Sequence, residues 1–192
     1  GLSGGSVPML GGISLSLELM NRIIEIDREN MVAVVEPGVI TNQLDAKLAE
    51  EGLFFAGYPL SEEFCQIGGN VAENAGGGRA VKYGVTSRYV TGIEAVLPSG
   101  EILNVGGKRY KDVTGYDLLH LLIGSEGTLA VFTKIILRVL PRPGARAMMR
   151  IVLTDEAEAL DMVPELLADP VVQPSAIEFI DKVSLAETIK LQ

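Results

Sequence analysis

The chain has 192 residues, of which 47% are hydrophobic and 21% charged, and its formal net charge is −9. These values are typical of a globular protein rather than a disordered one. The negative charge argues against nucleic acid or an anionic membrane as a partner. No apolar run approaches the roughly 20 residues of a membrane-spanning helix, and no signal peptide is visible. The one cysteine, Cys65, excludes an internal disulfide framework and fits a cytoplasmic protein.

Alternation, helical periodicity and turn residues predict the elements of the first half of the chain. They are a strand at 31–36 that ends at Pro37-Gly38, an amphipathic helix at 41–51 with Thr41 as N-cap and Gly52 as its stop, and a hairpin of strands 93–97 and 101–105 around Pro98-Ser99-Gly100.

The second half begins with a short helix at 116–123 and a long strand at 128–140. The odd-numbered side chains of this strand share one face, and its other face is also largely apolar, so we expect it in the centre of a sheet. Pro141-Arg142-Pro143-Gly144 interrupts the pattern and marks a candidate domain boundary. Beyond it we expect a strand at 147–153, a helix at 155–168 capped by Thr154 and kinked or broken at Pro164, a strand at 176–180 and a helix from Asp181.

The stretch from Ile67 to Gly78 holds five glycines and two asparagines around a short apolar run. Glycine at this density allows positive φ and close approach of the backbone to a ligand. Successive N–H groups in such turns can hold an anion such as a pyrophosphate. The carboxamides of Asn70 and Asn74 suit either loop backbone or the edge of a heterocycle. Glycine-rich turns without a ligand are also common, so this stretch does not decide the function by itself.

Further short motifs occur on both sides of it: Gly1-Leu2-Ser3-Gly4-Gly5, Pro37-Gly38-Val39, Lys82-Tyr83-Gly84-Val85-Thr86, Val113-Thr114-Gly115-Tyr116-Asp117-Leu118 and Gly124-Ser125-Glu126-Gly127-Thr128-Leu129. In this order and spacing they resemble the FAD-binding domain of the vanillyl-alcohol-oxidase superfamily, the PCMH-type FAD-linked oxidases. Within it, the chain is most similar to the glycolate oxidase flavoprotein subunit and the D-lactate dehydrogenases.

The resemblance implies an α+β fold. Over residues 1–143 it implies a partial FAD-binding domain, a subdomain with a mainly antiparallel sheet flanked by helices. Residues 144–192 would begin a ferredoxin-like substrate domain. The family's pyrophosphate loop and a small α/β subdomain would precede Gly1, and its histidine-rich metal and base motif would follow Gln192. We therefore expect an internal fragment that binds FAD weakly or not at all by itself, with the catalytic base and any metal outside it.

The resemblance also assigns cofactor-binding residues. The pyrophosphate loop would end with Ser3, Gly4 and Gly5. Beside the ribityl and diphosphate portion would lie Pro59, Ser61 and Cys65, and around the flavin Ile67, Gly68, Gly69, Asn74, Ala75 and Gly76. This loop would be supported by Tyr83 and Gly84, and near the adenine and flavin walls would lie Glu126 and Gly127. The chain departs from the family at Leu60-Ser61, where aspartate-proline is common, and at Ala130, where glycine is usual.

Several of these residues have simpler interpretations. Glu126 could merely cap a turn, and Tyr116 with Asp117 more readily begins a helix than contacts substrate. Covalent attachment of flavin to Cys65 is disfavoured, because the most similar relatives bind FAD non-covalently. His120 lies on a leucine-rich helical stretch without a second ligand, so we expect a structural role and neither a catalytic residue nor a metal site. The chain contains no phosphate-loop motif and no strand–GxGxxG–helix fingerprint.

The resemblance implies FAD-dependent oxidation of a 2-hydroxy acid, glycolate or D-lactate, by hydride transfer to flavin N5. It further implies a companion flavoprotein or iron–sulfur subunits, and a cytoplasmic enzyme that could reach the inner membrane through them. Two alternatives stay open. One is a cofactor-free companion subunit of a glycolate oxidase complex, against which the intact glycine-rich stretch argues. The other is an aryl-alcohol or sugar-lactone oxidase of the same superfamily, which the motifs match less well.

Overall fold

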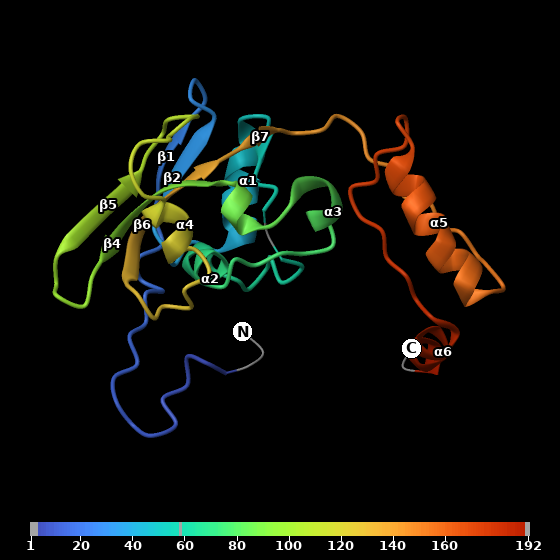
Figure 1. Cartoon of the computed structure of the whole chain (residues 1–192), viewed down its shortest axis with the longest axis horizontal. Helices are drawn as coiled ribbons and strands as arrows, with labels where there is room; N and C mark the ends of the chain where they lie inside the picture. The colour runs from blue at the N-terminus through green and yellow to red at the C-terminus, as the bar shows by residue number, and fades with distance from the viewer. Residues whose placement is uncertain (1–3, 58, 191–192) are drawn as a thin grey trace.

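The computed structural model describes residues 4–57 and 59–190, so the predicted site residue Ser3 lies outside the described part. Its main feature is a five-stranded sheet with the order β1-β2-β6-β4-β5, in which every neighbouring pair is antiparallel. Figure 1 shows this sheet with helices beside it. The strands are β1 (Ile23–Asp27), β2 (Val32–Val35), β4 (Val90–Val96), β5 (Ile102–Gly106) and β6 (Val131–Arg138). The expected α+β class is therefore confirmed.

A two-stranded ribbon and seven short helical elements complete the described part of the chain. The ribbon pairs β3 (Leu53–Phe54) with β7 (Leu140–Pro141). The helical elements are α1 (Thr41–Glu50), α2 (Ile67–Ala72), α3 (Ala80–Tyr83), the 3-10 turn η1 (Thr86–Arg88), α4 (Leu118–Leu122), α5 (Glu156–Ala168) and α6 (Lys182–Lys190).

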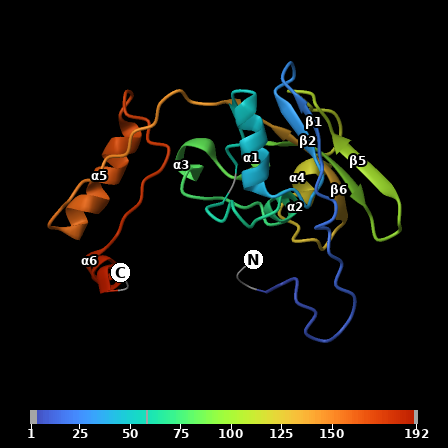
Figure 2. The same cartoon turned by 180° about the vertical axis from the view of Figure 1, so that it is seen from behind.

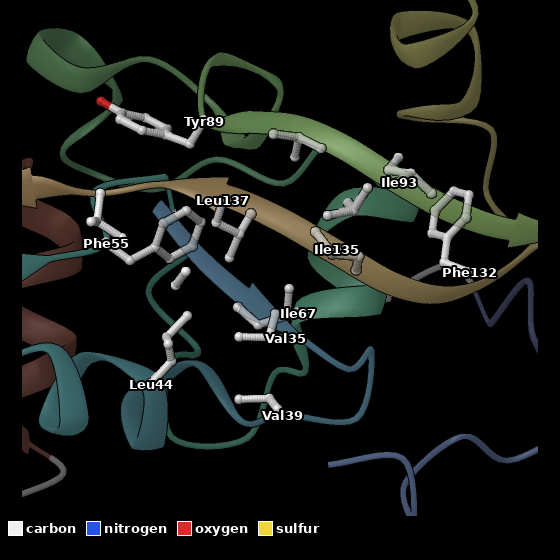
Figure 3. Close-up of a cluster of buried hydrophobic side chains, with 14 of the residues drawn as sticks. Val35, Val39, Leu44, Phe55, Ile67, Tyr89, Ile93, Phe132, Ile135 and Leu137 are labelled. Carbon is white, nitrogen blue, oxygen red and sulfur yellow. The ribbon is translucent and has the colours of Figure 1, made fainter. Parts of the chain in front are cut away.

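The hydrophobic core lies between the central strands and helices α1 and α2 (Figure 3). Val35 and Ile135 come from the sheet, Leu44 from α1 and Ile67 from α2. All four residues are 0% exposed. Burying a side chain of this size contributes about 1.5–3 kcal/mol. The core therefore fixes the start of α2, where the glycine-rich stretch begins, against the middle of the sheet.

Strand β6 occupies the central position predicted for the long apolar strand, but its register differs from strict alternation. The pairing steps from Glu94–Lys134 to Ala95–Phe132, which leaves Thr133 as an extra residue in β6. This bulge turns Phe132 onto the buried face and leaves Thr133 half-buried. The strand also begins at Val131 rather than at residue 128.

Helix α1 forms as predicted, although Thr41 is its first residue and Ile40 occupies the N-cap position. The Thr41 hydroxyl is instead engaged across the fold, within 3.2 Å of the Cys65 carbonyl oxygen. Strand β1 was not predicted. It pairs with β2 through a turn in which the Asn30 N–H donates to Asp27 Oδ1 at 3.0 Å.

The chain beyond residue 143 differs from expectation. Helices α5 and α6 form, but the strands expected at 147–153 and 176–180 do not, because no described strand pairs with them. Asp155, not Thr154, caps α5 by accepting from the Ala157 N–H at 2.9 Å, and this helix continues through Pro164. Figure 2 shows both helices standing apart from the sheet, and neither contains a buried residue. No described helix is long and apolar enough to span a membrane.

Candidate cofactor site

The glycine-rich stretch begins as helix α2, so Gly68 and Gly69 are helical rather than in the positive-φ turns expected from their density. Gly68 is needed for close packing instead: a Cβ there would lie 2.5 Å from the Pro37 Cβ. Its N–H donates to the Pro37 carbonyl at 2.7 Å. Gly76 is packed in a similar way, since its Cβ would lie 2.8 Å from the Val85 Cγ1. Gly68 lets the Pro37 turn approach the helix, and Gly76 lets Val85 approach the loop that follows it.

The segment after α4 joins the end of α2 through two backbone hydrogen bonds. The Gly124 N–H donates to the Val71 carbonyl at 3.0 Å, and the Glu126 N–H donates to the Ala72 carbonyl at 2.8 Å. Figure 1 shows this segment running beneath α4 next to α2. Two motifs that are more than 50 residues apart in the sequence are thereby held side by side.

Left-handed backbone is concentrated at this junction. Asn74 has φ 50° and Glu126 has φ 51°, and among the described residues only Met31 is another non-glycine residue with positive φ. Gly124 and Gly127 adopt φ of 79° and 74° in the same loop. Such conformations cost about 1–3 kcal/mol for a non-glycine residue and are found preferentially at functional sites. The junction therefore has the backbone character of a ligand site.

Both asparagines of the stretch hold its structure. The buried Asn70 donates from Nδ2 to Thr41 Oγ1 at 2.8 Å, and its backbone carbonyl accepts from the Ala75 N–H at 2.8 Å. Asn74 Oδ1 accepts from the Ser87 N–H at 2.9 Å. Of the two interpretations open from the sequence, contact within the protein is the one that these carboxamides show.

Thr86 anchors the far side of the same loop and was not singled out in the sequence. Its buried hydroxyl oxygen lies 2.8 Å from the Gly57 carbonyl oxygen and 2.7 Å from that of Ala75. Its N–H also donates to the Ala75 carbonyl at 3.0 Å. The hydroxyl and the N–H of Thr86 thus both hold the Ala75 carbonyl, which orients the glycines that follow Ala75.

Tyr83 and Gly84 lie immediately before Thr86. The Tyr83 ring packs edge-on against Phe54 at 5.5 Å between centroids, and its carbonyl accepts from the Tyr89 hydroxyl at 2.7 Å. Gly84 adopts φ 77°, where a Cβ would also press on the Arg88 side chain at 2.8 Å. Tyr83 thus packs against the ribbon, and Gly84 gives room to the Arg88 side chain.

The segment that contains Pro59, Ser61 and Cys65 is tied to the start of α1. The Ser61 carbonyl accepts from the Cys65 N–H at 2.9 Å, and the Cys65 carbonyl accepts from the Thr41 N–H at 3.0 Å. The half-buried Cys65 Sγ lies 3.2 Å from Thr41 Oγ1. The thiol therefore has a polar neighbour, the Thr41 hydroxyl.

Gly4 and Gly5 lie in an exposed segment without helix or strand. The Val7 N–H donates to the Gly4 carbonyl at 3.0 Å, but no described hydrogen bond joins either glycine to the α2 region. The segment reaches the site only later, where the Met20 carbonyl accepts from the Gly38 N–H at 2.7 Å. The structure therefore does not bring these two predicted residues together with the others.

Three groups at the α2 junction are placed to meet a ligand. Gly69 and Gly127 are exposed, and no atom lies within 4 Å of where their Cβ would be. Ser125 Oγ is buried, and no described residue is its hydrogen-bond partner. An unsatisfied buried hydroxyl is costly unless a ligand or water completes it. Ser125 was missed as a candidate, although its place between Gly124 and Glu126 was the available signal.

The charges nearest to the Pro37 turn are compensated within the protein. Glu36 is 5% exposed, and its carboxylate accepts from Arg22 Nη2 at 2.7 Å, from Arg22 Nε at 3.0 Å and from the Arg22 N–H at 2.8 Å. These hydrogen bonds hold the pKa of Glu36 below its ordinary value, outweighing the effect of burial. The turn that contacts Gly68 therefore presents no uncompensated negative charge to an anionic ligand.

The described residues offer no other chemistry at this site. No group of three or more His, Cys, Asp or Glu within them could hold a metal ion. His120 Nδ1 lies 2.8 Å from the carboxylate of Asp117, which caps α4. That pairing gives His120 a structural partner.

Comparison with known proteins identifies the family of the chain. The family described as FAD binding domain matches residues 1–106, more than half of the chain. The chain is 46% identical over 192 residues to an FAD-linked oxidoreductase of Mycobacterium tuberculosis, 42% over 184 residues to a glycolate oxidase subunit of Bacillus subtilis, and 45% over 182 residues to a D-lactate dehydrogenase of Archaeoglobus fulgidus. These matches cover 100%, 96% and 95% of the chain but only 41%, 39% and 40% of the relatives.

Among solved structures, an alkyldihydroxyacetonephosphate synthase is similar over 66% of this chain and 22% of its own, with a TM-score of 0.57 and 28% sequence identity. The chain spans about two fifths of the length of the curated relatives that it matches. The unpartnered Ser125 hydroxyl and the open backbone at Gly69 and Gly127 fit a cofactor that approaches the main chain closely. The chain belongs to the FAD-binding domain family, and its cofactor is FAD.

Proposed function

We propose that the protein containing this chain oxidises a 2-hydroxy acid of the glycolate or D-lactate type, and that this chain supplies the central FAD-binding part. Similarity to a glycolate oxidase subunit and to D-lactate dehydrogenases supports the substrate class. The single observation that carries the site assignment is the junction of α2 with the segment 124–127. There, two distant motifs meet, and left-handed residues and an unpartnered buried hydroxyl coincide.

In this proposal the chain binds and orients the cofactor. Gly69 and Gly127 let FAD lie against the backbone, because neither carries a Cβ and nothing fills the space. Ser125 donates its hydroxyl proton to an acceptor on the cofactor. Asn74 and Thr86 keep the loop in the shape that receives it. When bound, FAD supplies the hydride acceptor, its N5 atom.

We assign no catalytic base to residues 4–190. Removal of a hydride from the substrate carbon requires a group that takes the hydroxyl proton. His120 is the only histidine of the chain, and it is paired with Asp117 on α4. We propose that another part of the enzyme provides this group.

We also propose that residues 1–143 form the cofactor-binding unit and that 144–192 belong to a ferredoxin-like substrate domain. The separation of α5 and α6 from the sheet supports this division (Figure 1; Figure 2). A relative named as a glycolate oxidase subunit supports the proposal that the enzyme has companion subunits, a flavoprotein or an iron–sulfur protein.

The test is anaerobic reduction of the flavin in the FAD-loaded protein that contains this chain. The readout is the absorbance near the flavin maximum. Glycolate or D-lactate should bleach the flavin, whereas L-lactate and an aryl alcohol should not. Flavin that stays oxidised with every 2-hydroxy acid contradicts the proposed substrate class. A protein that takes up no FAD contradicts the cofactor role itself and favours a cofactor-free companion subunit.

A further inference from the structure

A second site lies at the end of the sheet where the inner strands β2 and β4 begin and β6 ends. It is a recess of about 360 Å³, within the range of small-ligand pockets, and none of its described lining residues is acidic. Its basic lining consists of Arg88, Lys108, Arg109, Arg138 and His120. The recess gathers these basic side chains in a chain whose net charge is −9.

Three of these five basic side chains already hold carboxylates, and one of them is His120, whose Nδ1 lies 2.8 Å from Asp117 Oδ2. Lys108 Nζ lies 2.8 Å from Asp27 Oδ2 and 2.6 Å from Glu25 Oε1, which raises the pKa of Lys108. Arg109 Nη2 lies 2.5 Å from Asp112 Oδ2. Lys108 and Arg109 therefore brace the walls of the recess and are less available to a ligand.

The other two guanidinium groups have no carboxylate partner among the described residues. Arg138 Nη2 donates to the Arg88 carbonyl at 3.1 Å, and its Nε is buried without a hydrogen-bond partner. A buried unsatisfied donor costs about 1–3 kcal/mol, and more when it is charged. An anion that pairs with this guanidinium in the recess removes that cost.

Aromatic rings fix the place of Arg138. Its Cζ lies 5.5 Å from the centroid of Tyr89 and 5.7 Å from that of Tyr110. The Tyr89 ring is buried, and Tyr110 is 87% exposed at the rim. A guanidinium held between rings is pre-organised to receive a carboxylate or phosphate.

We propose that this recess binds a small oxyanion, a carboxylate or a phosphate ester, through Arg88 and Arg138. The site is separate from the α2 junction, although Ser87 borders both: it lines the recess, and its N–H donates to Asn74. The inference does not depend on the substrate of the enzyme.

Isothermal titration calorimetry of the full chain tests this proposal, with sodium phosphate and sodium succinate as the two ligands. The ionic strength is kept low and constant with sodium chloride. At least one of the two anions should bind saturably. Binding of phosphate alone identifies a phosphate ester site, and binding of succinate alone a carboxylate site. Arg88→Gln should weaken binding about tenfold, the loss expected for one charge-assisted hydrogen bond. Arg138→Gln should weaken it at least as much.

Lys47→Gln is the matched control, because Lys47 is an exposed cation on α1 that pairs with Glu50. It should bind the anion as the unaltered chain does. Three results would overturn the proposal: no saturable binding of either anion, equal affinity in both arginine variants and the unaltered chain, or an equal loss in Lys47→Gln. Displacement of the anion by FAD from the unaltered chain also overturns it, since the anion then occupies the cofactor site.

Discussion

At the scale of single residues, adjacent glycines in α2 do different things. A methyl group at Gly68 would lie 2.5 Å from the Pro37 Cβ and 3.1 Å from its Cα, whereas one at Gly69 meets nothing within 4 Å. Gly68→Ala should therefore destabilise the chain by about 1–3 kcal/mol, because backbone must move to admit it. Urea unfolding measures this change.

Gly69→Ala is the matched control, since it adds the same methyl group one position along the same helix. It should leave the free energy of unfolding unchanged or raise it by roughly 0.5–1 kcal/mol through helix propensity. Equal destabilisation by both substitutions would show that the packing against Pro37 is not what requires glycine.

Ser125 supplies a second prediction at this scale. Its Oγ is buried without a described partner, so Ser125→Ala should leave stability unchanged or improve it slightly. If the hydroxyl donates to FAD, the same variant should bind FAD about two- to tenfold more weakly. Thermal unfolding without FAD and a titration with FAD separate the two effects. A loss of stability without a change in FAD affinity would contradict the assignment.

These residues also show what the sequence could not predict. Glycine density indicated a ligand loop, but it could not distinguish Gly68, which packs on Pro37, from Gly69, which is open. Nor could it show that Asn70 reaches Thr41, because that contact depends on how α1 and α2 are placed. Tertiary contacts decide the role of each residue within a motif.

At the scale of elements, Thr86 joins the glycine-rich loop to the segment after β3. Thr86→Val keeps the shape of the side chain but leaves the buried carbonyls of Gly57 and Ala75 with one fewer donor. We expect a loss of about 1–3 kcal/mol in the free energy of unfolding, measured with urea. Thr114→Val, at an exposed position, is the control and should change little. Comparable losses in the two variants would contradict the role given to Thr86.

The ion pair that joins Arg22 to Glu36 predicts a pH dependence. Its hydrogen bonds lower the folded pKa of Glu36 below the ordinary value of 4.5. The pair therefore stabilises the fold above that value, and this contribution is lost as the pH falls through the folded pKa. Urea midpoints measured from about pH 7 to pH 3 should fall less steeply in Glu36→Gln than in the unaltered chain.

Glu63→Gln, which alters an exposed carboxylate, provides the comparison for this experiment. It should follow the pH profile of the unaltered chain. A Glu36→Gln profile that runs parallel to both would mean that this pair contributes nothing to the acid sensitivity of the fold.

The sequence predicted elements well where a strand or helix carries its own signal. The 93–97 and 101–105 hairpin forms as β4 and β5, and the apolar strand after residue 128 is central as β6. Periodicity could not reveal the bulge at Thr133, because it arises from pairing with β4. The strands expected at 147–153 and 176–180 fail for a related reason: a strand needs a partner, and the described chain gives them none.

At the scale of the whole molecule, the packed part of the chain ends with β7. Helices α5 and α6 bury no residue, and Met148, Met149 and Val152 before them are 98%, 82% and 81% exposed. The proposed cofactor site lies on the packed part, at the α2 junction, next to the core that Figure 3 shows. Binding of FAD should therefore depend on groups at that junction.

The most direct test is a titration of FAD with the purified chain, followed by flavin fluorescence, for the unaltered protein and for Gly69→Ala. We predict saturable binding that is weak enough to be lost on desalting. We also predict weaker binding by Gly69→Ala, whose stability should be intact. A Gly69→Ala variant that binds FAD as tightly as the unaltered protein would contradict a cofactor site at the α2 junction.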